Sequence, residues 1–123
     1  MKNRILMVDD EPEFLELTKL RLEANGYIVA TADEGLSALA VARDFQPDLI
    51  VLDINMPGMD GGDVAERIHA TPELAKTPIV FLTALVNEGE AAATQNSAQG
   101  EHFLSKTGGS ERLLAYLKKT LAN

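Results

Sequence analysis

The chain has 123 residues, of which 46% are hydrophobic and 24% are charged, and its formal net charge is −8. This length supports one domain, residues 1–123, with a single core, and no apolar run is long enough for a membrane span or a signal peptide, so we expect a cytoplasmic domain. An acidic chain without a Lys/Arg cluster is a poor candidate for binding nucleic acid or a membrane, and the absence of cysteine excludes disulfides and thiolate metal sites.

The chain begins with a predicted strand and helix. Residues 5–8 form an apolar run, predicted as a buried strand, and Asp9, Asp10 and Glu11 follow it directly. Pro12 suits the first turn of a helix that runs to about residue 25, and Gly26 is its expected C-terminal stop. The face expected to be buried carries Phe14, Leu15, Thr18 and Leu22.

A second strand and helix follow in the same order. Residues 27–31 are predicted as a strand, and Asp33 is predicted to cap a helix that ends near residues 45–47. The helix face expected to pack inward carries Leu36, Leu39 and Ala40. Residues 49–52 are apolar throughout, which favours a strand buried on both faces, and Asp53 ends that strand.

A tight turn is expected after Asp53, because Pro57 fixes its own φ while Gly58 and Gly61 tolerate positive φ. A helix over residues 63–70 and a linker over 71–77 lead to a strand at 78–82, which ends at Thr83. The helix residues expected to face inward are Val64, Ala65 and Ile68.

The last quarter of the chain carries a weak helix, a short strand and a final helix. Residues 87–99 have only alanines as apolar residues, so we predict a mobile helix that buries little surface. Residues 101–104 are predicted as a strand that leads into Lys106, and Ser110 is predicted to cap the final helix. That helix is expected to bury Leu113, Leu114, Leu117 and Leu121.

Five alternations of strand and helix predict an α/β fold with a doubly wound, five-stranded parallel sheet in the flavodoxin-like order 2-1-3-4-5. The first and third strands are then neighbours, and their carboxyl ends meet at one edge. Asp9, Asp10 and Asp53 should therefore converge there, with Thr83 and Lys106 at the same edge.

Three converging carboxylates need compensation, because each like-charge pair ~5 Å apart costs about 3 kcal/mol at an effective dielectric near 20. Lys106 supplies one positive charge, and Mg²⁺ suits the remaining oxygens. We expect Asp10 to bind Mg²⁺ directly and Asp9 directly or through water, with Asp53 and the Asn55 carbonyl as further ligands.

A carboxylate beside Mg²⁺ can also attack phosphorus, and phosphoryl transfer chiefly needs positioning and charge neutralisation. We therefore expect Asp53 to be phosphorylated, with Lys106 neutralising the group and the Thr83 hydroxyl donating a hydrogen bond to it. Each residue alone has an ordinary alternative: Asp9 and Asp10 cap a helix, Thr83 bonds to backbone, and Lys106 is a solvated surface residue.

Four motifs along the whole chain resemble the receiver domain of two-component response regulators. They are Val-Asp-Asp-Glu at 8–11, Asp-Ile-Asn-Met-Pro-Gly-Met-Asp-Gly at 53–61, Leu-Thr-Ala at 82–84 and Phe-Leu-Ser-Lys at 103–106. The resemblance implies a phosphoacceptor rather than an enzyme, in which a histidine kinase or a His-containing phosphotransfer protein phosphorylates Asp53 with Mg²⁺ as cofactor. It also implies a switch in which Thr83 moves toward the phosphate and Phe103 turns inward.

The resemblance further implies that the signal leaves through the surface of residues 87–99, 101–104 and 110–121, toward an output partner that the sequence does not name. A homodimer on this surface is an expectation without other support, and the chain is either a stand-alone receiver or part of a longer protein. Thr107 replaces the proline usual after the lysine, so we expect a trans Lys106–Thr107 bond or a strained cis one. Phe103 lacks the hydroxyl of the commoner tyrosine, and His69 and His102 are expected to be structural or surface residues.

Three other interpretations compete with phosphorylation at Asp53. A receiver-like interaction module that is never phosphorylated would be consistent with the altered loop 106–109. A phosphatase with an aspartyl intermediate usually needs a second acid two residues after the nucleophile, where this chain has Asn55. A flavodoxin-type cofactor site is disfavoured because Asp9, Asp10 and Glu11 would repel its phosphate, and no GxGxxG motif is present.

Overall fold

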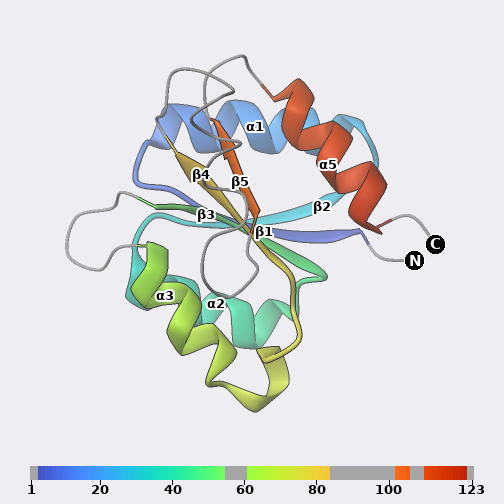
Figure 1. Ribbon diagram of the computed structural model, residues 1–123. Helices are drawn as coiled ribbons and strands as arrows, with labels where there is room; N and C mark the ends of the chain where they lie inside the picture. The colour runs from blue at the N-terminus through green and yellow to red at the C-terminus, as the bar shows by residue number, and fades with distance from the viewer. Residues whose placement is uncertain (1–2, 55–60, 84–101, 106–109, 122–123) are drawn as a thin grey trace.

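The computed structural model describes residues 3–54, 61–83, 102–105 and 110–121. Five parallel strands form one sheet in the order β2-β1-β3-β4-β5, which confirms the predicted fold (Figure 1). The strands are β1 (Arg4–Val8), β2 (Ile28–Ala32), β3 (Leu49–Asp53), β4 (Ile79–Thr83) and β5 (His102–Ser105).

Helices cover both faces of this sheet. They are α1 (Pro12–Ala24), α2 (Gly35–Phe45), α3 (Gly61–His69) and α5 (Glu111–Leu121), with a short 3₁₀ helix η1 (Pro72–Leu74). Helices α1 and α5 lie on one face, and α2 and α3 lie on the other (Figure 1). The predicted helix at 87–99 and its predicted mobility lie outside the described residues. Within the described segments, no helix has the length and apolar character needed to cross a bilayer.

The core has two halves because successive side chains of a strand point to opposite faces of the sheet. In β1, Ile5 and Met7 pack toward α1 and α5, while Leu6 and Val8 pack toward α2 and α3. All four are essentially inaccessible to water. Strands β1 and β3 are therefore buried on both faces, as their unbroken apolar runs predicted, whereas the edge strand β2 exposes Ile28 and Thr31.

Helix α1 confirms the sequence prediction. Leu15, Thr18 and Leu22 are buried, and Phe14 is partly buried against the same half of the core. Pro12 is the first helical residue. Gly26 follows the helix with φ +93°, a conformation that glycine adopts without the steric cost other residues would meet.

Helix α2 corrects the sequence prediction of its inward face. Leu36 is 63% exposed, Ala40 is exposed and Leu39 is only partly buried. The fully buried positions of the helix are small residues, and Leu39, Val41 and Phe45 pack partly buried against the same half of the core. The buried residues of the helix are Gly35, Ala38 and Ala42.

The start of α2 is also corrected: its N-cap residue is Glu34 rather than Asp33, and the Glu34 side chain makes no capping hydrogen bond. The Ser37 hydroxyl instead donates to the Glu34 carbonyl, at 3.1 Å. At the other end of the helix, the Arg4 guanidinium donates to the Phe45 carbonyl (3.0 and 2.8 Å) and stacks over the Phe45 ring. Arg4 thereby satisfies a carbonyl that the end of the helix leaves open.

Helices α3 and α5 present the inward faces that the sequence predicted. Helix α3 begins two residues earlier than predicted and buries the expected Val64, Ala65 and Ile68. Ser110 directly precedes α5. Of the four leucines expected to be buried, Leu113, Leu117 and Leu121 are buried and Leu114 is partly buried.

Candidate functional site

The carboxyl ends of β1 and β3 bring the first acids together. The two strands are adjacent, and Val8 pairs with Leu52, so Asp9 and Asp53 leave the sheet at the same level. The Asp9 N–H donates to the Ala32 carbonyl of β2 at 3.1 Å, and the Ile54 N–H donates to the Leu82 carbonyl of β4 at 3.0 Å. The backbone around both acids is therefore fixed by neighbouring strands.

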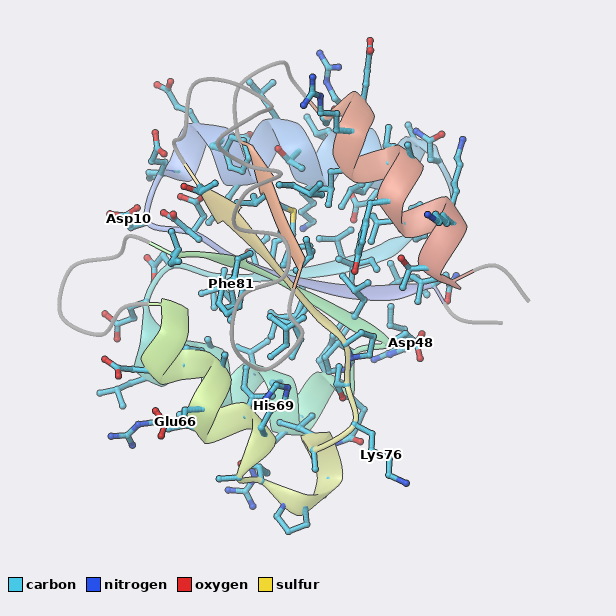
Figure 2. All side chains as sticks on the ribbon, viewed as in Figure 1. Asp10, Asp48, Glu66, His69, Lys76 and Phe81 are labelled. Carbon is cyan, nitrogen blue, oxygen red and sulfur yellow. The ribbon has the colours of Figure 1, made fainter. Side chains whose placement is uncertain are left out.

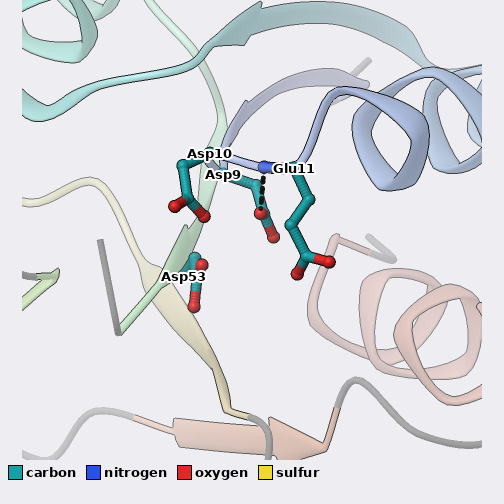
Figure 3. Close-up of side chains that lie close together, drawn as sticks. All are labelled: Asp9, Asp10, Glu11 and Asp53. Carbon is teal, nitrogen blue, oxygen red and sulfur yellow. Dashed lines mark hydrogen bonds between the residues drawn. The ribbon is translucent and has the colours of Figure 1, made fainter. Parts of the chain in front are cut away.

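Four carboxylates converge at this edge. One oxygen from each of Asp9, Asp10, Glu11 and Asp53 lies within 4.8 Å of those of the other three (Figure 3). The structure thus confirms the predicted convergence of Asp9, Asp10 and Asp53, and it adds Glu11, which was not predicted as a member of the site. The signal in the sequence was its position directly after Asp10, but the direction of its side chain depends on backbone angles that the sequence does not specify.

The four acids differ in depth. Asp9 is 0% exposed and Asp53 is 4% exposed, whereas Asp10 and Glu11 face solvent. One Asp9 oxygen, Oδ1, accepts the Glu11 N–H at 2.9 Å. The ordinary interpretation of Asp9 as a residue that helps start the helix is therefore correct in part. The same carboxylate also forms the floor of the acidic cluster.

Thr83 is the last residue of β4 and is 6% exposed. Its strand lies beside β3, with Leu82 opposite Asp53, so Thr83 stands at the same edge as the acids. Asn55, Lys106 and the Lys106–Thr107 bond lie outside the described residues. Phe103 lies in β5 opposite Phe81, but its side chain is also outside the described part.

The donor set suits a hard divalent cation. It consists only of carboxylate oxygens, which are the ligands that Mg²⁺ and Ca²⁺ prefer. Each pair of like charges ~5 Å apart opposes folding by about 3 kcal/mol at a dielectric near 20. A bound cation would attract each carboxylate and so offset the repulsion between them. The two deep acids lie on rigid backbone, while the two outer ones leave room for the waters that Mg²⁺ retains.

The acid Asp48 lies far from this edge (Figure 2). In Figure 2, Asp10 and Asp48 lie at opposite ends of the sheet, and the Asp48 carboxylate accepts the N–H of Arg4. His69 lies in α3 and is partly buried, outside the acidic cluster. The four acids thus form a local feature of one sheet edge.

Comparisons with known proteins agree with this geometry. The family model "Response regulator receiver domain" matches residues 5–118. The DNA-binding dual master transcriptional regulator RpaA of Synechocystis is 35% identical over 123 residues, covering 96% of this chain and 48% of RpaA. The chain therefore spans about half the length, or less, of the curated relatives RpaA and PleD of Caulobacter vibrioides.

Two solved structures show the same fold. A putative response regulator from Chloroflexus aurantiacus has a TM-score of 0.84 and 29% identity, with both chains covered completely. The BeF₃-activated receiver domain of Klebsiella pneumoniae RstA has a TM-score of 0.81 and 29% identity, covering 98% of this chain and 100% of the other.

The acidic cluster is typical of the Mg²⁺ site of receiver domains, which are signalling phosphoacceptors rather than enzymes in the ordinary sense. The sheet order, the converging acids and the match over residues 5–118 lead to one assignment. The chain belongs to the response regulator receiver domain family.

Proposed function

We propose that Asp53 accepts a phosphoryl group from a histidine kinase or a His-containing phosphotransfer protein, in a reaction that requires Mg²⁺. The observation that carries this proposal is the placement of the Asp53 carboxylate at the end of β3, with three other carboxylates within 4.8 Å. A site built this way attracts a divalent cation and places one acid beside it.

The chemistry follows from the roles of the individual side chains. An Asp53 oxygen attacks phosphorus, so an O–P bond forms while the P–N bond of the phosphohistidine breaks, and the imidazole nitrogen keeps the electron pair. Asp9, Asp10, Asp53 and the Asn55 carbonyl would hold Mg²⁺, which supplies charge neutralisation for the phosphoryl oxygens. The Thr83 hydroxyl would donate a hydrogen bond to the phosphoryl group, and the Lys106 ammonium would pair with it.

The output is proposed to be a conformational switch. Thr83 would move toward the phosphoryl group and Phe103 would turn inward, which alters the surface formed by residues 87–99, 101–104 and 110–121. This surface would then control a partner or an output domain, or support a homodimer. The relative RpaA is a DNA-binding transcriptional regulator of which this chain covers 48%, and this supports control of an output domain in such relatives.

The proposal is tested by labelling with acetyl phosphate in the presence and absence of Mg²⁺. Asp53→Asn should lose labelling, because the amide is not a nucleophile toward phosphorus. Asp44→Asn is the matched control, since Asp44 is an exposed acid of α2 outside the cluster. We expect the wild type and the control to be labelled only with Mg²⁺. Continued labelling of Asp53→Asn would refute the assignment.

Beryllofluoride separates the alternative function from this one. The RstA receiver was obtained in a BeF₃-activated form, which supports the use of this phosphoryl analogue on a related chain. We expect the wild type to bind it with Mg²⁺. A chain that neither binds beryllofluoride nor accepts phosphate would instead be an interaction module that works without phosphorylation.

A further inference from the structure

The side chain of Glu11 does not do what its position at a helix start suggests. Glu11 is the N-cap residue of α1, with extended backbone (φ −100°, ψ 103°), and its side chain makes no capping hydrogen bond. Its carboxylate lies instead among those of Asp9, Asp10 and Asp53, as Figure 3 shows. The extended N-cap conformation therefore directs this acid into the cluster.

The backbone of Glu11 serves the same cluster. Its N–H donates to Asp9 Oδ1 at 2.9 Å, which orients the deepest carboxylate of the site. Both the main chain and the side chain of one residue are thus directed at the cation-binding edge. The other three carboxylates of the cluster repel that of Glu11, and a bound cation would offset this repulsion.

Glu13 shows that an acid near this helix end need not join the cluster. It lies in the first turn of α1, is exposed and carries the same charge. In the described part of the chain, it is not among the acids whose oxygens converge. The N-terminal end of α1 would favour either carboxylate through its dipole, so the dipole alone does not account for the placement of Glu11.

We propose that Glu11 is a positioning residue for Mg²⁺: as an exposed acid at the rim, it accepts a hydrogen bond from a water of the bound ion and tightens the binding of that ion. This inference rests on the proposed function, since it assumes that the cluster holds Mg²⁺. A water-mediated role fits an exposed carboxylate because Mg²⁺ loses its waters reluctantly and keeps several of them in protein sites.

The test compares Glu11→Gln with Glu13→Gln by calorimetric titration with MgCl₂. Both variants lose one negative charge from the same end of α1. We expect the dissociation constant for Mg²⁺ to rise about fivefold in Glu11→Gln and less than about twofold in Glu13→Gln, because the first charge lies much closer to the ion. Glu11→Asp keeps the charge and should retain most of the affinity.

Thermal unfolding supplies a readout that a purely structural role would not produce. Without Mg²⁺, the Tm of Glu11→Gln should be higher than that of the wild type, because the variant lacks one of the mutually repelling charges. The rise in Tm on adding saturating Mg²⁺ should be smaller for Glu11→Gln than for the wild type. A lowered Tm in both conditions would assign Glu11 to helix stability and overturn the proposal.

The variant Asp10→Asn distinguishes the absence of a role for Glu11 from the absence of a Mg²⁺ site. If Asp10→Asn weakens Mg²⁺ binding while Glu11→Gln matches Glu13→Gln, the role of Glu11 is refuted and the site stands. If the wild-type protein shows no Mg²⁺ binding, the metal site of the proposed function is refuted together with the role of Glu11.

Discussion

Asp53 carries a charge in a place where a charge is unfavourable without a counter-ion. It is 4% exposed and shares the edge of the sheet with three other carboxylates. Burial of a charge and its closeness to like charges both lower the stability of the folded state. The same features favour the binding of a divalent cation, because the attraction between a cation and carboxylates is strongest where water is excluded.

This trade-off predicts the effect of Asp53→Asn on stability. Without Mg²⁺, the variant should unfold with a free energy about 1–2 kcal/mol higher than that of the wild type, because one buried charge is removed. With Mg²⁺ the difference should shrink or reverse, because the wild type gains more from the ion. Urea unfolding in the two conditions measures both values.

Asp44→Asn is again the control, and it should stay within about 0.5 kcal/mol of the wild type in both conditions because Asp44 is exposed. An Asp53→Asn variant that is less stable than the wild type without Mg²⁺ would show that the carboxylate contributes to folding in its own right.

At the scale of elements, α2 shows how a helix is fitted to a filled sheet. Its fully buried residues Ala38 and Ala42 are small and pack with the large side chains of the sheet. Its large Leu36 lies outside. Arg4 holds the C-terminal end through the Phe45 carbonyl and ring. The helix is therefore close to the sheet along its length, with little room for added volume.

A substitution on each side of α2 tests this arrangement. Ala38→Leu should lower the free energy of unfolding by about 1–3 kcal/mol, because the added methylene groups have no space at a residue that is 0% exposed. Leu36→Ala, at a residue 63% exposed, should change it by less than about 0.5 kcal/mol. Urea unfolding measures both changes, provided that the dependence of the unfolding free energy on urea concentration is the same in all variants. A larger loss of stability in Leu36→Ala than in Ala38→Leu would instead support the inward face that the sequence predicted.

For the whole molecule, topology is what places the site. Parallel strands end at one edge, and the order reverses between β1 and β3, so residues more than forty positions apart, such as Asp9 and Asp53, become neighbours. The two halves of the core, on opposite faces of the sheet, hold these strands rigid. Phosphoryl chemistry benefits from such rigidity because it depends mainly on positioning.

The same topology explains how much could be predicted from the sequence. The alternation of apolar runs and amphipathic segments predicted a parallel sheet, whose simplest strand order is 2-1-3-4-5, and this order predicted the convergence of Asp9, Asp10 and Asp53. The inward face of α2 could not be predicted, because alanine and leucine are both apolar and periodicity alone allows either set. The contribution of Glu11 and the position of the α2 N-cap at Glu34 depend on local backbone angles at the helix ends, which the residue types do not determine.

The central claim is that Asp53 is the residue that becomes phosphorylated. Borohydride reduces an acyl phosphate of aspartate to homoserine, which peptide mass spectrometry locates in the chain. After treatment with acetyl phosphate and Mg²⁺, we expect homoserine at position 53 alone. Homoserine at position 9 or 10, or none at position 53 under conditions where the protein is labelled, would contradict the account.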